Sequence, residues 1–275
     1  VESERFVSVV ICVLLTAAPP ATNGWGYDGH LITCKLAQPR FKASTSSAVS
    51  KLLPTYAKND LSSLCSWADE MKSKYPWSAP LHYADTDNVC NFNYNRDCNS
   101  GICVVGAINN YTNQLLNSSS HYNLTEALLF LAHFVGDIHQ PLHVGFKSNL
   151  GGNTITVYWY DQQTNLHSVW DSSIIETEED DFFDSDVDEM IASIQHNITT
   201  GWANQIPNWE ACSQVTCPNT YANESSAAAC QWAYSDAAQG ADLGDDYFFS
   251  RYPIVNLRLA QGGVRLAKVL NNIFG

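Results

Sequence analysis

Positive charge is scarce in this sequence. Its 275 residues include 14 Lys and Arg against 28 Asp and Glu, which gives a formal net charge of −14 at pH 7. A protein that holds nucleic acid on a broad basic surface needs Lys and Arg to neutralise phosphates, so the composition argues against such a surface. Phosphate chemistry is still possible at a local site whose positive charge comes from bound metal.

The sequence also lacks an apolar run of the roughly 20 residues that a membrane-spanning helix requires. The run 6–18 has 13 residues and is followed by small ones, with Thr22 and Gly24 at the two positions that guide signal cleavage. We therefore expect residues 1–24 to be a secretory signal peptide; a buried N-terminal helix is the alternative. Cleavage removes two Glu and one Arg, so the mature protein, residues 25–275, would carry a charge of −13. Because no later apolar run is long enough to span a membrane, we expect it to form no stable membrane association.

Cysteine pairs of the C-x-x-C type, which are typical of zinc fingers, do not occur. Of the nine cysteines, cleavage would remove Cys12 and leave eight, an even number that in an exported protein suggests four disulfides. Five N-glycosylation sequons agree with export. They begin at Asn110, Asn117, Asn123, Asn197 and Asn223.

Repeats of about 20–50 residues and low-complexity linkers are also absent, so we expect one domain over residues 25–275. Helical patterns dominate it. Asn123 and Glu126 are spaced as in a capping box and precede the run 127–138, whose apolar residues lie on all sides. This pattern predicts a buried helix. Residues 154–160 alternate and include β-branched residues, which predicts a short strand after a turn.

Two further segments have plain structural interpretations. Residues 176–189 hold nine acidic residues in 14. We expect a solvated helix start there rather than a metal site, because nothing fixes a ligand geometry. The C-terminal stretch 254–274 is amphipathic, with Gly262 and Gly263 inside it, and we expect it to cover the core.

Ionisable side chains interrupt the predicted buried helix. His133 and Asp137 are four residues apart, so both lie on one face. Such a pair is costly in an apolar helix unless it is partnered or binds a metal, and a hydrogen-bonded core pair would explain it equally well. His143 follows, and His167 and Asp171 repeat the same spacing. Two His-x-x-x-Asp pairs and a third His within 39 residues favour a zinc site, because neutral imidazole and carboxylate are typical zinc ligands.

Further candidate ligands precede this helix. Asp69 and His82 lie in the motifs WADEMK and LHYAD, and His30 lies five residues after Trp25. After signal cleavage, the α-amino group and carbonyl of Trp25 can chelate a metal once the amine is neutral. Each residue singly also has a structural interpretation, as a cap, a satisfied core histidine or a packing residue. Only the joint pattern favours a metal site.

Together the motifs WGYDGH, WADEMK, LHYAD, AHFVGDIHQPLHVG, GGNTI and NLHSVWD resemble those of the plant bifunctional nucleases and the fungal single-strand-specific nucleases. The resemblance runs through essentially all of residues 25–275. It implies a mainly α, single-domain fold similar to that of bacterial phospholipase C, with a small β-hairpin and three Zn²⁺ per chain. It also implies the disulfides Cys34–Cys65, Cys90–Cys230, Cys98–Cys103 and Cys212–Cys217.

By this resemblance, every metal-ligand position of the family is occupied in this sequence by a residue that can bind a metal. One ion would be held by Asp69, His82, His133 and Asp137. A second would be held by His143, His167 and Asp171. A third would be held by His30 and by the amine and carbonyl of Trp25, with Asp137 bridging it to the first.

The resemblance implies catalytic roles for Lys72, Asp85 and Asp137. Lys72 stands where the family has a basic residue that faces the phosphate. Tyr83 and Asp85 stand where an aromatic residue and an acid hold the base. Residues 86–88 read Thr-Asp-Asn where many relatives have Thr-Pro-Asp, which puts the base preference in doubt.

From this resemblance we expect a secreted, monomeric zinc endonuclease of single-stranded DNA and RNA, extracellular (apoplastic) or vacuolar, that leaves 5′-phosphates and also acts on 3′-nucleotides. Single strands would be preferred, because Tyr83 needs an unpaired base to stack on. One alternative is a zinc phospholipase C with the same metal core; Asp171 and Tyr83 favour the nuclease. The other is a secreted protein that binds zinc without catalysis, although structural zinc sites usually have four protein ligands and the second site has three.

Overall fold

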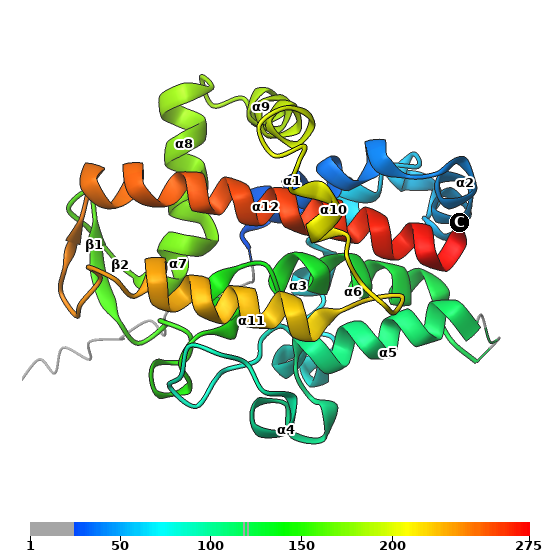
Figure 1. Cartoon of the computed structure of the whole chain (residues 1–275), viewed down its shortest axis with the longest axis horizontal. Helices are drawn as coiled ribbons and strands as arrows, with labels where there is room; N and C mark the ends of the chain where they lie inside the picture. The colour runs from blue at the N-terminus through cyan, green and yellow to red at the C-terminus, as the bar shows by residue number, and fades with distance from the viewer. Residues whose placement is uncertain (1–24, 118, 120) are drawn as a thin grey trace, which may run out of the picture.

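The fold is built around one long C-terminal helix. The computed structural model describes residues 25–117, 119 and 121–275, so the expected signal peptide, residues 1–24, lies outside the described part. Figure 1 shows α12 (Asp245–Phe274) crossing the whole molecule, with the strands near its start and the C-terminus at its end. No helix of the described part is both long and apolar enough to span a membrane.

The other helices surround α12. Above it in Figure 1 lie α1 (Tyr27–Ala37), α2 (Ala43–Leu52), α9 (Val187–Thr199) and α10 (Ile206–Trp209). Below it lie α3 (Trp67–Glu70), α4 (Tyr94–Asp97), α5 (Val104–Asn117), α6 (Leu124–Asp137) and α11 (Pro218–Ala228). Near the strands lie α7 (Leu166–Ser168) and α8 (Ile174–Phe182).

The position of α12 differs from the expected one. The helix begins at Asp245, before the expected start at residue 254, and continues through Pro253. Residues 258–267 are buried on every side, and the helix contributes Leu259 to one hydrophobic cluster and Leu266 to the other. The expectation that this stretch covers the core is wrong, because its arginines are buried rather than solvent-facing.

The predicted buried helix and hairpin both form, which confirms the mainly α fold with a small β-hairpin. Asn123 caps α6 by accepting a hydrogen bond from the backbone N–H of Glu126 (3.2 Å). Every residue from 127 to 137 is buried. The predicted strand is the central one of a sheet with the order β2–β1–β3, formed by β1 (Thr156–Trp159), β2 (Gln162–Asn165, antiparallel) and β3 (Asp242–Leu243, parallel).

Four disulfides tie the loops to this framework. They are the pairs that the resemblance implies: Cys34–Cys65, Cys90–Cys230, Cys98–Cys103 and Cys212–Cys217. Cys90 and Cys230 are 140 positions apart. Their bond links the chain that follows His82 to the π-helix Ala229–Ala233, which continues α11. All five sequon asparagines are at least partly exposed.

The acidic segment 176–189 is only in part the solvated helix start that we expected. It spans the end of α8 and the start of α9, where the side chain of Asp186 accepts hydrogen bonds from the first backbone N–H groups. Glu178, however, is 3% exposed and accepts a hydrogen bond of 2.5 Å from Asn256 Nδ2. Burial raises the pKa of Glu178 to about 8, so its carboxyl group is mostly protonated at neutral pH.

We expect Glu178→Gln to raise the melting temperature at about pH 8 much more than at about pH 5. The glutamate has a pKa of about 8 in the folded state and an ordinary value of 4.5 when unfolded. Its proton therefore favours folding at low pH, and this contribution is lost as pH rises through that window. Thermal unfolding at both pH values measures the effect, with the exposed Asp181→Asn as control. An equal gain at both pH values would contradict the explanation.

Candidate metal centre

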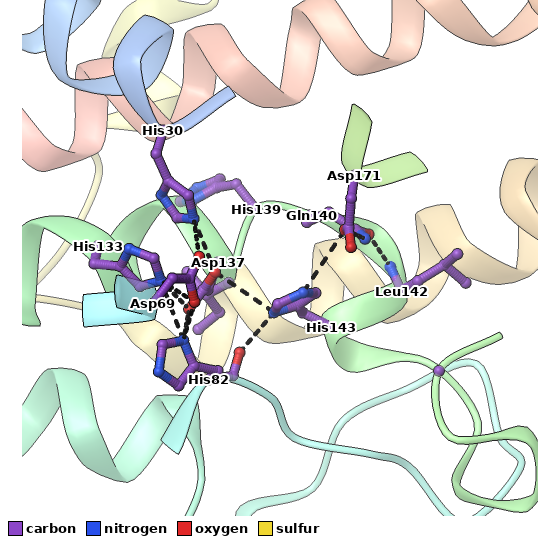
Figure 2. Close-up of polar contacts among 12 residues, drawn as sticks. His30, Asp69, His82, His133, Asp137, His139, Gln140, Leu142, His143 and Asp171 are labelled. Atoms are coloured by element: carbon purple, nitrogen blue, oxygen red, sulfur yellow. Dashed lines mark hydrogen bonds and ion pairs between the residues drawn. The ribbon is translucent and has the colours of Figure 1, made fainter. Parts of the chain in front are cut away.

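The C-terminal end of α6 is the centre of the candidate site. His133 and Asp137 lie there one helical turn apart, and His143 follows in the 3₁₀ helix Pro141–Val144. Other segments bring the remaining ligand candidates: His30 from α1, Asp69 from α3, His82 after the 3₁₀ helix Pro76–Leu81, His167 from α7 and Asp171 from the π-helix Val169–Ser173. Figure 2 shows how these side chains, apart from His167, converge from separate parts of the chain.

Four of these side chains form a compact group. Asp69 Oδ1 lies 3.5 Å from His82 Nδ1 and 3.4 Å from His133 Nε2. Asp137 Oδ2 lies 2.9 Å and 3.2 Å from the same two nitrogens, which are 3.1 Å apart. Around a tetrahedral zinc, bonds of about 2.0–2.2 Å place the ligand atoms roughly 3.3–3.6 Å apart. The donor set and its size therefore fit a zinc ion.

Asp137 faces a second set of atoms with its other oxygen. Asp137 Oδ1 lies 3.3 Å from His30 Nε2. His30 is fully buried, and neither of its ring nitrogens forms a hydrogen bond with the described residues. Such unpaired buried atoms are costly, which is consistent with a cation beside them. Trp25 is also buried. Both Trp25 and His30 lie next to Gly136, because a Cβ added at this glycine would be 2.8 Å from His30 Nδ1 and 3.8 Å from Trp25 Cδ1.

His143, His167 and Asp171 form a separate group. Asp171 Oδ1 lies 3.9 Å from His143 Nε2, and Asp171 Oδ2 lies 3.4 Å from His167 Nε2. The Nδ1 atoms of the two histidines contact backbone carbonyls, that of His82 and that of Gly151, each at 2.6 Å. A proton on Nδ1 leaves the Nε2 lone pair free, so these contacts orient both rings as metal ligands.

The pKa values of three candidate histidines suit metal binding, and that of His133 reports the nearby carboxylates. Burial lowers the pKa of His82 to about 4 and that of His167 to about 3, and it also lowers the pKa of His143. These rings are therefore neutral at neutral pH, as metal ligation requires. Burial also acts to lower the pKa of His133, but the carboxylates of Asp137 and Asp69 outweigh it and raise the pKa to about 10. Positive charge is thus strongly favoured between these two carboxylates.

Gln140 supports the site and was missed by the sequence analysis. Its Nε2 donates a hydrogen bond to Asp171 Oδ1, and its Oε1 accepts one from Leu142 N, both at 2.5 Å (Figure 2). The side chain is fully buried. Gln140 thereby holds Asp171 from the same turn that carries Asp137 and His143. Its place between two candidate ligands was the only local signal.

Two buried arginines of α12 contact His139, which lies in the turn between Asp137 and His143. Arg258 Nε donates to the carbonyl of His139 (3.1 Å), and Arg265 Nη1 donates to His139 Nε2 (3.0 Å). His139 Nδ1 contacts Val135 O at 2.7 Å, so the ring is neutral with its proton on Nδ1. Burial and both arginines lower its pKa. Glu224 of α11 accepts hydrogen bonds from both arginines, so His139 belongs to a structural network.

A pocket of about 490 Å³ lies along the chain that follows His82. This chain runs beside residues 143–146, because Ala84 N donates to His143 O and Thr86 N donates to Gly145 O (both 2.8 Å), and Thr86 forms a parallel bridge with Phe146. Tyr83, 43% exposed, and Asp85 line the same pocket. Burial raises the pKa of Asp85 to about 7, against the opposite effect of a nearby lysine.

The sequence analysis missed most of the pocket lining, including Arg96, Lys147 and Leu150. They lie far from Tyr83 in sequence and belong to no chemical motif. Lys72 lies outside this pocket, at the edge of the four-residue group. Its Nζ is 2.7 Å from Asp69 Oδ1 and its side chain is 18% exposed. The ammonium group is therefore close to a candidate ligand, and its side chain is partly exposed.

The sequence matches known proteins along most of its length. The model of the S1/P1 nuclease family matches residues 25–275. Endonuclease 2 of Arabidopsis thaliana is 54% identical, over 98% of this chain and 97% of its own length. Nuclease P1 of Penicillium citrinum is 34% identical, over 91% of this chain and 98% of its own. Nuclease S1 of Aspergillus oryzae is 32% identical, over 92% of each chain.

Proposed function

The chain belongs to the S1/P1 nuclease family, and from this premise we propose that it is a zinc-dependent endonuclease that cleaves single-stranded DNA and RNA to 5′-phosphate products. Relatives named nuclease or endonuclease, matched over nearly their whole length, support a phosphodiesterase. The observation that carries the zinc dependence is the group of four ligand atoms with separations of 2.9–3.5 Å. The same matches give no support to a phospholipase C.

In this proposal three zinc ions use nine residues of the chain. One ion is held by Asp69, His82, His133 and Asp137. A second is held by His143, His167 and Asp171. The third is held by His30 and the amine and carbonyl of Trp25, with Asp137 shared. Bound zinc polarises phosphoryl oxygens and lowers the pKa of water to about 7.

The protein's own side chains bind and orient the strand. Lys72 offsets the negative charge that develops on the phosphoryl oxygens. Tyr83 stacks on a base in the pocket, where Leu150 supplies a further apolar surface and Asp85 a hydrogen-bonding carboxyl group. A base held in a duplex cannot reach Tyr83 unless it is flipped out, which costs a few kcal/mol. Single strands are therefore the preferred substrates. The same site accepts 3′-nucleotides, which present a phosphate beside one base.

Product analysis tests this function. The zinc-loaded protein, beginning at Trp25, is mixed with a single-stranded oligonucleotide, with its duplex and with a 3′-nucleotide, each with and without a chelator. We expect chelator-sensitive release of 5′-phosphorylated products, slower from the duplex, and restored by zinc. Failure to cleave any nucleic acid would contradict the proposal. Phospholipid vesicles would then separate a phospholipase C from a protein that binds zinc without catalysis.

An N-terminal extension tests the proposed role of the Trp25 amine. With Gly24 retained, this nitrogen becomes an amide and has no lone pair for a metal. We expect the extended protein to retain two zinc ions instead of three and to lose activity by at least about 100-fold, or about 2.7 kcal/mol of transition-state stabilisation. Zinc content per chain and kcat/KM on single-stranded DNA measure both effects. Three ions and full activity in the extended form would contradict the assignment.

We further propose that the protein acts as a monomer after export, in an extracellular or vacuolar compartment. The export is supported by the set of four disulfides, because such bonds persist where the surroundings are oxidising; the monomer is the default state. The exposed sequons agree with passage through the secretory pathway. Gel filtration and glycosidase treatment of the secreted protein test the two statements. A dimer, or an unglycosylated product with free thiols, would contradict them.

A further inference from the structure

An exposed tryptophan lies on the surface that leads to the base pocket. Trp77 belongs to the 3₁₀ helix Pro76–Leu81, which ends beside His82, and is 55% exposed. A 3₁₀ helix has about three residues per turn, so side chains three positions apart lie on the same face. Pro80 is three positions after Trp77 and lines the pocket together with Tyr83. At a rise of about 2.0 Å per residue, Trp77 lies roughly 6 Å along this row from Pro80, and Tyr83 follows just beyond the end of the helix.

The Trp77 side chain is partly packed against other rings and remains 55% exposed. Its centroid lies 5.7 Å from the ring of Tyr75 and 5.7 Å from the ring of Phe130. The hydroxyl of Tyr75 in turn donates a hydrogen bond to Glu126 Oε1 (3.0 Å), which fixes that ring to α6. The indole is therefore already ordered, so a ligand that stacks on it loses little binding energy to ordering the side chain.

Positive charge accompanies this aromatic surface on a chain that has little of it. Lys74 is exposed, and its Nζ lies 5.2 Å from the centroid of the Tyr75 ring. Lys72 precedes it by two positions and reaches the metal-binding group through Asp69. Two of the 14 Lys and Arg of the sequence thus lie on the short segment between Asp69 and Trp77. An aromatic surface beside lysines is the combination that binds single-stranded nucleic acid without reading its sequence.

We propose that Trp77 is a second base platform for single-stranded substrates, with Lys74 binding a phosphate of the same strand. This inference rests on the proposed nuclease function. A strand with one base at Tyr83 reaches Trp77 with another base a few nucleotides away, because stacked nucleotides advance about 3.4 Å each. The platform accepts any base, since stacking does not read hydrogen-bonding edges. It favours long strands over dinucleotides.

Substrate length tests the proposal. Zinc-loaded wild type and Trp77→Ala are assayed on a dinucleotide and on a strand of about 12 nucleotides. We expect KM for the long strand to rise about tenfold in the variant, as for the loss of one base–aromatic stack, with kcat unchanged. KM for the dinucleotide should stay within about twofold, because a dinucleotide does not span the row. Trp77→Phe should keep most of the affinity for the long strand. Lys74→Ala should reduce the slope of log affinity against log salt concentration by about one, as for the loss of one phosphate contact.

A matched control separates this role from a general effect of surface mutation. Tyr56 is 70% exposed and lies on another short 3₁₀ helix, Thr55–Ala57, next to Lys58. Tyr56→Ala should change neither KM. Equal losses on both substrates in Trp77→Ala would show that Trp77 only packs against Phe130, which would overturn the proposal. If wild type cleaves neither substrate, the nuclease function itself fails, so the two failures are distinguishable.

Discussion

Asp137→Asn should lose two zinc ions and lower kcat/KM on single-stranded DNA by about 10³-fold or more. The two oxygens of Asp137 face different groups, Oδ2 toward His82 and His133 and Oδ1 toward His30. An amide has one oxygen and no charge, so it cannot serve both sets of ligands. The expected loss corresponds to about 4 kcal/mol, which is within the several kcal/mol that bound metal contributes to stabilising transition-state charge.

Zinc content per chain, measured together with kcat/KM, tests this expectation. His167→Gln is the matched control, because His167 lies only in the group with His143 and Asp171. It should cost one ion and leave the other two in place. Circular dichroism of each variant shows whether the helices persist. Loss of a single ion from Asp137→Asn would contradict the assignment of this carboxylate as a bridge.

Arg265→Met should destabilise the folded protein by about 3 kcal/mol, the lower end of the range for breaking a buried ion pair. Arg265 is 2% exposed and donates to both oxygens of Glu224, to His139 Nε2 and to Trp209 O. The Glu224 side chain is 36% exposed, so water compensates part of the loss. With His139 released, the turn that carries Asp137 and His143 should loosen. We expect zinc affinity to fall by about 10-fold, the lower end of the range for removing a direct partner of a metal ligand, because Arg265 acts on the ligands only through the turn.

Arg251→Met is the matched control for this variant. Arg251 lies in the same helix and covers the ring of Tyr247 at 4.4 Å, as Arg265 covers the ring of Tyr221 at 4.4 Å. Its acidic partner, Asp236, is 76% exposed, and the other hydrogen bonds of Arg251 go to Ser250 and to the carbonyls of Trp232 and Ser235, outside the turn that carries Asp137 and His143. Urea unfolding and zinc competition against a chelator should show a smaller loss of stability and an unchanged zinc affinity. Equal losses of zinc affinity would contradict the role of Arg265.

Local patterns in the sequence predicted the parts of the site that depend on short spacing. His133 and Asp137 lie one turn apart because both belong to α6, whose apolar residues predicted its burial. His167 and Asp171 have the same spacing, but they lie on a short α-helix and the π-helix that continues it. The spacing placed each pair on one face. It did not show how the pairs approach each other, and only the resemblance to a family implied that.

The supporting contacts depend on partners far apart in the chain. His139 and Arg265 are 126 positions apart, and nothing near either residue indicates the other. The stretch 254–274 was therefore expected to cover the core, and the buried contacts of Arg265 were not foreseen. Glu178 was missed for the same reason, because its partner Asn256 lies 78 positions later. A charged residue is assigned to the surface until its buried partner is known.

The Cys90–Cys230 disulfide sets an order of events during synthesis. A chain emerges at about 5–20 residues per second, so Cys90 waits roughly 7–28 s for its partner, which follows 140 positions later. Cys98 and Cys103 are five positions apart and can close first, which removes the nearest competing thiols. The disulfide that follows the loop with Tyr83 and Asp85 can therefore close only when nearly all of the chain has left the ribosome, and this side of the pocket is completed late.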